Sequence, residues 1–259
     1  MRKELFFTHY ALRITPMPYY EQTPYNIRLE WGAQGINALS PTSDVTIVVD
    51  VLSFTTCVEI AVSRGATIFP FRGDDPAAYA KEKGALLATK KRTAVSDFTL
   101  SPTSLMTIPP DTRLVLPSPN GSLLTMTAAE YGTVLAGCLR NSQAVAAYAA
   151  ANFEKITVIP CGERWWHNMS LRPSLEDILG AGAIISRLGG SKSPEAIQAE
   201  GVYRAFAEMS DPLLNCSSGV ELREQGFEQD VLYAAEENVS DCVPIFANDS
   251  YQAIDWSNL

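Results

Sequence analysis

The segment Val49-Asp50-Val51-Leu52-Ser53-Phe54-Thr55-Thr56 joins an acid to several hydroxyl side chains at the end of an apolar run. The Asp50 carboxylate can bind Mg²⁺ through oxygen, and a helix beginning just after it would offer N–H donors to a phosphate. This pattern favours a combined metal and phosphate site, with Asp50 as metal ligand and catalytic residue and with substrate contacts from Ser53, Thr55 and Thr56. In the structural alternative, Ser53 or Thr55 merely caps the helix and Asp50 accepts nearby backbone hydrogen bonds.

A second polar cluster, Pro117-Ser118-Pro119-Asn120-Gly121-Ser122, lies between an expected strand and an expected helix. Asn-Gly favours a turn, and the glycine lets the backbone approach an anion at the start of a helix. The segment lacks the Lys-Ser/Thr ending of a Walker A loop. We expect phosphate contacts from Asn120, Gly121 and Ser122; the alternative is a Pro-Asn-Gly turn with a serine cap.

A third cluster contains Pro160-Cys161-Gly162-Glu163, which follows another apolar run, and Ser174-Leu175-Glu176-Asp177. Two adjacent acids, Glu176 and Asp177, in the first turn of a helix can complete a metal site with Asp50. Glu163 is a candidate general acid or base. Ser174 and Asp177 also match the S-x-x-D capping box, which is a purely structural role.

Cys161 is a candidate thiol nucleophile, although a buried core cysteine is the commoner case. The chain has only two histidines, His9 and His167, and neither lies at an obvious partner position. Arg164 and Arg172 flank Trp165-Trp166-His167-Asn168-Met169, and their guanidinium groups can clamp an anionic substrate. Paired tryptophans also pack loops onto the protein body or onto a partner subunit, so a homodimer is a candidate assembly.

The elements that must position these residues alternate between short apolar strands and helices of about ten residues. We expect an α/β fold: a mainly parallel sheet flanked by helices on both faces, with a helical C-terminal portion. The expected strands are 45–51, 66–71, 113–116, 133–136, 155–160 and 242–246. The expected helices are 54–64, 76–83, 121–130, 143–152, 174–188, 193–209 and two shorter ones within 211–237. Residues 93–110, rich in Ser, Thr and Pro, form a connection long enough to be an active-site loop.

The composition limits the classes of function. The chain has 259 residues, of which 46% are hydrophobic and 19% charged, and we expect a single domain, 1–259, whose first 43 residues are irregular. A net charge of −9 argues against nucleic acid and against an anionic membrane surface. Five widely spaced cysteines without a C-x-x-C motif indicate reduced thiols in a cytoplasmic protein. No apolar run approaches the roughly 18 residues of a membrane helix.

In their order, these clusters resemble the 2-phosphosulfolactate phosphatase family of coenzyme M biosynthesis. The matching segments are Val48-Val49-Asp50-Val51-Leu52 with Phe54-Thr55-Thr56, Asn120-Gly121-Ser122, Cys161-Gly162, Ser174-Leu175-Glu176-Asp177 with Ala181-Gly182-Ala183, and Gly226-Phe227-Glu228-Gln229-Asp230-Val231. The resemblance spans residues 45–246 and makes residues 44–259 a phosphatase-like core. It implies a Mg²⁺-dependent phosphomonoesterase with Asp50, Glu176 and Asp177 as metal ligands and Asn120 to Ser122 as phosphate contacts.

The chain departs from the family's pattern at three places. Ser53 stands where family members usually carry an arginine. Ala88-Thr89-Lys90-Lys91-Arg92 replaces a glycine-rich loop, and Asp97-Phe98-Thr99-Leu100-Ser101-Pro102 replaces a later F-D-x-G-N-S-P segment. Serine cannot replace the bidentate charged contact of an arginine, so Lys90, Lys91 and Arg92 are candidates to supply that charge.

The leading hypothesis is a Mg²⁺-dependent phosphatase that acts on a small anionic phosphoester, 2-phosphosulfolactate or a related phosphorylated 2-hydroxy acid. The departures motivate an alternative, a non-catalytic binder of an anionic metabolite. A cysteine hydrolase built on Cys161 ranks third.

Overall fold

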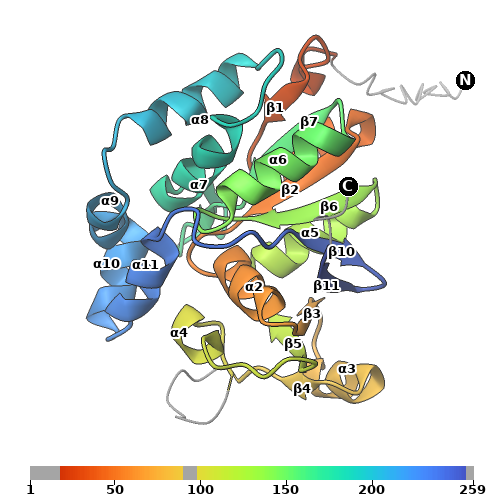
Figure 1. Ribbon diagram of the computed structural model, residues 1–259, viewed down its shortest axis with the longest axis vertical. Helices are drawn as coiled ribbons and strands as arrows, with labels where there is room; N and C mark the ends of the chain where they lie inside the picture. The colour runs from red at the N-terminus through yellow and green to blue at the C-terminus, as the bar shows by residue number, and fades with distance from the viewer. Residues whose placement is uncertain (1–17, 90–97, 255–259) are drawn as a thin grey trace, which may run out of the picture.

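The computed structural model describes residues 18–89 and 98–254, and a nine-stranded sheet forms the centre of this part of the chain (Figure 1). The strand order is β1-β7-β2-β6-β10-β11-β3-β5-β4. The strands are β1 (Ile27–Leu29), β2 (Val45–Val49), β3 (Thr67–Phe71), β4 (Leu86–Leu87), β5 (Arg113–Pro117), β6 (Thr133–Gly137), β7 (Ile156–Pro160), β10 (Pro244–Ala247) and β11 (Ser250–Ala253). A separate hairpin pairs β8 (Glu163–Arg164) with β9 (Leu171–Arg172).

The sheet consists of two parallel groups joined by an antiparallel hairpin. Strands β1, β7, β2 and β6 are parallel to one another, and so are β3, β5 and β4. Between the groups, β10 pairs antiparallel with β6 and with β11, and β11 pairs antiparallel with β3. These three antiparallel steps make the strands of the two groups run in opposite directions.

Helices cover both faces of the β1-β7-β2-β6 group. One face packs against α6 (Ser142–Asn152), α7 (Leu175–Ile185) and α8 (Pro194–Arg204), and the other packs against α1 (Gly32–Leu39) and α5 (Gly121–Ala129). Along β2, Ile47 and Val49 enter the first core and Val48 enters the second. Because side chains alternate between the faces and both faces are covered, the strand must be apolar throughout.

The remaining helices pack near the β3-β5-β4 strands or gather in the C-terminal part of the chain. α2 (Phe54–Ser63) packs on β3, β6 and β11, while α3 (Pro76–Lys83) packs on β4 and β5. Short α4 (Pro102–Leu105) adjoins α11 (Glu228–Ala235), which gathers with α9 (Ser210–Asn215) and α10 (Ser217–Glu224) (Figure 1). The buried Asp230 carboxylate of α11 accepts bonds from Ser101 Oγ at 2.7 Å and Thr103 N at 2.9 Å, so it holds α4 in place.

The predicted α/β fold with a mainly parallel sheet and a helical C-terminal portion is confirmed. The prediction of an irregular segment up to residue 43 is wrong for part of it, because β1 pairs with β7 and α1 follows; the chain also makes short 3-10 turns at Pro18–Glu21 and Ser40–Thr42. A three-residue strand and an eight-residue helix are too short for clear periodicity.

The C-terminal elements differ from prediction in length and number. Helix α8 ends at Arg204 instead of continuing to 209, because the Glu208 carboxylate accepts Ser210 N and Asp211 N and starts a new helix. Three short helices, not two, occupy residues 210–235, and strand β11 was not predicted. The expected loop 93–110 contains α4; its residues 93–97 lie outside the described part. None of the described helices is long and apolar enough to cross a bilayer.

The contact between α7 and α8 yields a stability prediction with a control on the partner helix. A Cβ added at Gly182 would lie 2.2 Å from the backbone oxygen of Ala199, whereas one added at Gly201 would meet no atom within 4 Å. We expect Gly182→Ala to lower the free energy of unfolding by about 1–3 kcal/mol. Gly201→Ala should leave it unchanged or raise it by up to about 1 kcal/mol. Urea unfolding measures both, and equal effects would contradict the packing described.

Candidate active site

Asp50 lies directly after β2, buried at the start of α2. One carboxylate oxygen, Oδ1, accepts the backbone N–H of Phe54 at 3.1 Å. The Asp50 backbone is fixed by Thr55, whose hydroxyl accepts the Asp50 N–H at 2.9 Å and donates to the Asp50 carbonyl at 2.8 Å. Thr56 Oγ1 likewise donates to the Val51 carbonyl at 2.8 Å. The two threonine hydroxyls therefore hold the strand-end loop that presents the carboxylate.

Ser53 differs from its threonine neighbours. Its side chain is only 4% exposed, and its hydroxyl has no hydrogen-bond partner among the described residues. A buried hydroxyl without a partner costs free energy, and a bound water or ligand oxygen would remove that cost.

The loop after β5 reaches the same place from the other strand group. Asn120 Nδ2 donates to Glu163 Oε2 at 3.0 Å, so the loops after β5 and β7 meet. Gly121 lies against Phe54, where a Cβ would be 2.2 Å from the ring, so no larger residue fits. Ser122 is fully buried, and its hydroxyl accepts Ser118 N and donates to the Leu116 carbonyl. Ser122 thus shapes the loop from within.

Asp177, in the first turn of α7, connects the loops that follow β2 and β7. Its Oδ1 accepts Val51 N at 2.8 Å, and its Oδ2 accepts Gly162 N at 2.8 Å and Ser174 Oγ at 3.0 Å. The capping-box prediction needs correction, because Ser174 contacts the Asp177 carboxylate and makes no side-chain cap bond to the helix backbone.

The site concentrates buried negative charge. Burial, followed by the charge of Glu176, raises the pKa of Asp50 to about 6, although the Phe54 N–H opposes the shift. Burial and the charges of Asp50 and Glu176 raise the pKa of Glu163 to about 7. Burial also holds the pKa of Asp177 well above its ordinary value. Arg172 partly offsets the charge at Glu163.

Cys161 is placed beside these carboxylates and is 3% exposed. Burial and the charge of Asp50 raise the pKa of its thiol well above the ordinary value. Because the thiolate is the nucleophilic form, this environment opposes nucleophilic catalysis by Cys161.

A cavity of about 220 Å³ opens onto the site and brings together several of the predicted residues. Asn120, Cys161, Glu163 and Arg164 line it, and Trp31 and Gln34 complete one wall. Arg164 is exposed, and its guanidinium donates to the Met169 carbonyl at 3.0 Å. Trp31 and Gln34 were missed because they lie in the segment predicted to be irregular, and no local pattern marks them. The predicted charges of Lys90, Lys91 and Arg92 lie outside the described residues.

The donor chemistry suits a hard cation only in part. Asp50 and Glu176 offer carboxylate oxygens of the kind Mg²⁺ prefers, whereas both oxygens of Asp177 already accept hydrogen bonds. In the part of the chain that the structure describes, no group of three or more His, Cys, Asp or Glu side chains could hold a metal ion. Mg²⁺ bound by one or two carboxylates usually takes its other ligands from water and substrate phosphate, and this site fits that arrangement.

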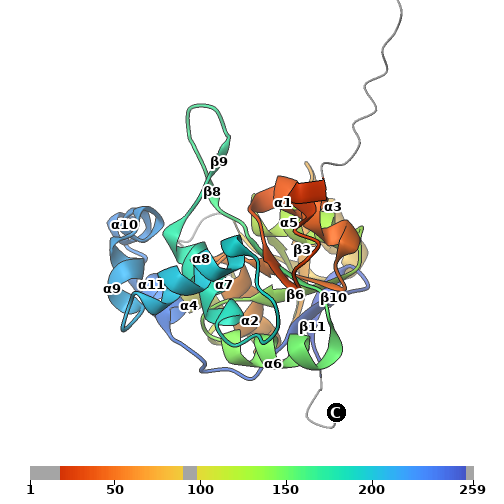
Figure 2. The same ribbon diagram turned by 90° about the horizontal axis from the view of Figure 1, so that it is seen from above.

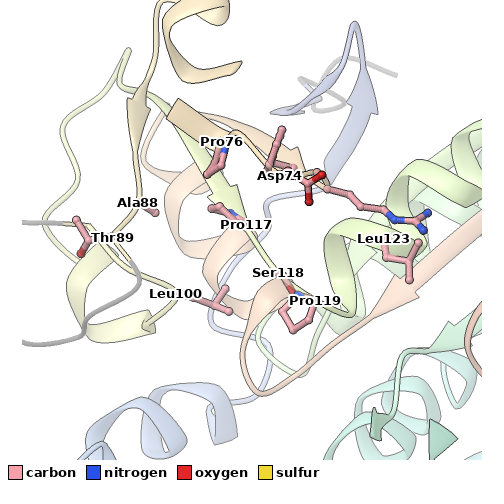
Figure 3. A pocket seen from close by; sticks show the side chains of 12 residues that line it. Asp74, Pro76, Ala88, Thr89, Leu100, Pro117, Ser118, Pro119 and Leu123 are labelled. Carbon is pink, nitrogen blue, oxygen red and sulfur yellow. The ribbon is translucent and has the colours of Figure 1, made fainter. Parts of the chain in front are cut away.

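The loop after β5 also lines a larger cavity of about 620 Å³ (Figure 3). Pro117, Ser118 and Pro119 form one wall, and Leu100 and Leu123 contribute apolar surface. The Ser118 hydroxyl accepts the Gly121 N–H at 3.1 Å. Among the residues that the structure describes, none of the predicted site residues lines this second cavity.

The raised pKa values predict how stability depends on pH in the presence of a chelator. Asp50 and Glu163 have ordinary pKa values of 3.8 and 4.5, against about 6 and about 7 in the fold. Between these pKa values the folded state therefore binds more protons than the unfolded state. As a result, the unfolding free energy falls as pH rises from about 4 to 7. Near pH 8, Asp50→Asn should exceed wild type in unfolding free energy by about 1–3 kcal/mol, and near pH 4 the two should agree.

Urea unfolding across this pH range measures the difference between the proteins. Glu163→Gln should behave in the same way, and Glu224→Gln, an exposed carboxylate on α10, should follow wild type. A gap between Asp50→Asn and wild type that stays constant with pH would contradict the raised pKa of Asp50.

Comparison with known proteins identifies the family of this chain. The model of the 2-phosphosulpholactate phosphatase family matches residues 34–249. A probable 2-phosphosulfolactate phosphatase of Carboxydothermus hydrogenoformans is 32% identical over 207 residues, 76% of this chain and 84% of that protein. The 2-phosphosulfolactate phosphatases of Methanothermobacter thermautotrophicus and Methanocaldococcus jannaschii are 26% and 27% identical, covering 79% and 82% of this chain and 87% and 92% of their own lengths. The chain belongs to the 2-phosphosulfolactate phosphatase family.

Proposed function

We propose that this protein is a Mg²⁺-dependent phosphatase that hydrolyses 2-phosphosulfolactate or a related phosphorylated 2-hydroxy acid. The observation that carries the proposal is the cluster of Asp50, Glu163 and Glu176, whose charges face one another beside a small cavity in a chain of this family. The charge of Glu176 raises the pKa of both Asp50 and Glu163, and clusters of buried like charges are typical of functional sites.

The reaction transfers a phosphoryl group to water. The water oxygen bonds to phosphorus, the bond from phosphorus to the ester oxygen breaks, and the products are the hydroxy acid and inorganic phosphate. Glu163 lies at the cavity wall with its carboxyl held by Asn120, where it can give a proton to the departing alkoxide oxygen. From the same position, Glu163 can instead accept a proton from the attacking water.

Asp50 and Glu176 would hold the magnesium ion, with further oxygens from water and from the substrate phosphate. The bound ion would neutralise phosphate charge. Asp177 would act by positioning, since it fixes the loops that carry Asp50 and Glu163.

The residues predicted to contact phosphate fall into two groups, direct contacts and supporting residues. Ser53 offers a hydroxyl that has no partner, Asn120 an amide and Arg164 a guanidinium at the cavity. The start of α2 supplies a favourable helix dipole, whereas the Phe54 and Gly121 N–H groups already donate to Asp50 and Ser118. Thr55, Thr56 and Ser122 support these groups from behind, because their hydroxyls are bonded to the backbone.

The size of the site suits a short substrate. A cavity of about 220 Å³ accommodates a few carbon atoms with acidic substituents; Arg164 adjoins Glu163 in sequence, and the charge of Arg172 acts on Glu163 in the fold. None of the five cysteines, all of which the structure describes, forms a disulfide; this is usual in the reducing cytoplasm, and we place the protein there.

Phosphate release tests the proposed activity. With Mg²⁺, the purified protein should release phosphate from 2-phosphosulfolactate faster than from larger phosphomonoesters, and a chelator should stop the release. Asp50→Asn should abolish turnover, and Glu163→Gln should lower kcat by about 10²–10⁴-fold, the usual contribution of a general acid or base. Glu224→Gln is the matched control and should keep full activity.

The alternatives give different results in this assay. Full activity in Asp50→Asn would refute the assignment. A folded protein that is stabilised by the phosphoester but releases no phosphate would be the non-catalytic binder. Loss of activity in Cys161→Ala, with Asp50→Asn still active, would favour the cysteine hydrolase.

Thermal unfolding tests the metal separately from catalysis. At neutral pH, Mg²⁺ together with inorganic phosphate should raise the melting temperature of wild type, because both ligands bind only the folded state. Asp50→Asn should lose this increase, and Glu224→Gln should retain it. An equal increase in all three proteins would place the metal elsewhere.

A further inference from the structure

The hairpin of β8 and β9 carries a loop that projects away from the body of the protein (Figure 2). We call residues 164–172 the arm. Its apolar side chains lie in solvent: Trp166 is 88% exposed, Met169 61% and Trp165 45%. Large apolar side chains grouped at one protruding place mark an interaction surface.

The arm is held in shape by its own hydrogen bonds. Trp165 N donates to the Ser170 carbonyl at 2.9 Å, Met169 N donates to the Trp165 carbonyl at 2.8 Å, and the Asn168 side chain accepts Ser170 N. His167 stacks edge-on against Trp166 with ring centroids 5.7 Å apart. An ordered loop loses little conformational freedom on binding, which favours association.

The arm is also basic in an acidic protein. It contains Arg164, His167 and Arg172 and has neither Asp nor Glu, whereas the whole chain has a net charge of −9. A partner surface that is apolar and acidic would complement it.

Such a surface lies at the root of the arm on the same protein. A hollow of about 470 Å³ lies between the end of β1, the start of α7 and one side of α8. Its apolar wall is formed by Leu29, Trp31, Pro173, Leu175, Ile178 and Val202.

The hollow also holds two carboxylates, Glu30 and Glu195. Neither forms an ion pair with any residue in 18–89 or 98–254. The Oε2 atom of Glu195 is buried and has no hydrogen-bond partner there. A buried carboxylate oxygen without a donor is an unsatisfied group that a cation from outside would complete.

We propose that the arm docks in this hollow on a second copy of the chain, so that the protein is a two-fold symmetric dimer. The tip of one arm would meet the root of the other, and the same contact would repeat in reverse, as an isologous interface requires. Trp166 would fill the apolar part, and the ring N–H of the neighbouring His167 would face Glu30 and Glu195.

Sedimentation velocity tests the proposal on the full chain. Wild type should have twice the monomer mass of 28.2 kDa. Trp166→Ala should raise the dimer dissociation constant by at least about thirty-fold, the effect of removing an aromatic residue that dominates an interface. Glu195→Lys should also weaken the dimer, because it places a cation against the basic arm.

Two matched controls separate this interface from general effects. Val239→Ala removes another apolar side chain that is 55% exposed, and Glu224→Lys makes the same charge change on α10, outside the hollow. Both should remain dimeric, and circular dichroism should show all four variants folded. A monomeric wild type, an assembly of another order, or a dimer unaffected by both Trp166→Ala and Glu195→Lys would overturn the proposal.

Discussion

Asp177 accepts three hydrogen bonds, from Val51 N, Gly162 N and Ser174 Oγ, all within 3.0 Å. The two N–H groups belong to the loops that follow β2 and β7, and these loops carry Asp50 and Glu163. A single carboxylate therefore fixes the separation of the two groups on which the chemistry depends. Its position in the first turn of α7 is favoured by the helix dipole, which stabilises negative charge there. The packing of α7 on the sheet is thus coupled to the geometry of the site.

Burying several carboxyl groups together at the site lowers the stability of the fold. Asp50, Glu163 and Glu176 are kept close together with little solvent, and the raised pKa values of Asp50 and Glu163 measure the free energy needed to ionise them there. Hydrophobic residues in the same places would pack without this cost. Active sites often retain such unfavourable groups because a bound ligand relieves the repulsion. In this protein, a cation held between the carboxylates would do so.

Much of this was predictable from sequence. Asp50, Asn120 and Glu163 could be placed near strand ends because each follows an apolar run, and two of them are in direct contact. The roles of Thr55 and Ser122 could not be predicted, since a hydroxyl at a helix start serves a ligand or its own backbone equally well. Trp31 could not be found because β1 and α1 are too short for a clear periodic pattern. The reversal of the β3-β5-β4 group depends on β10 and β11, of which only one strand was predicted.

The site is assembled from both strand groups. Here the two groups run in opposite directions, and the loop after β5 meets the loop after β7 through Asn120 and Glu163. The carboxylates come from one group and the amide from the other. Substitutions in the loop after β5 therefore act on both the cavity and Asp50, because the Gly121 N–H also bonds to the Asp50 carboxylate and Gly121 packs against Phe54.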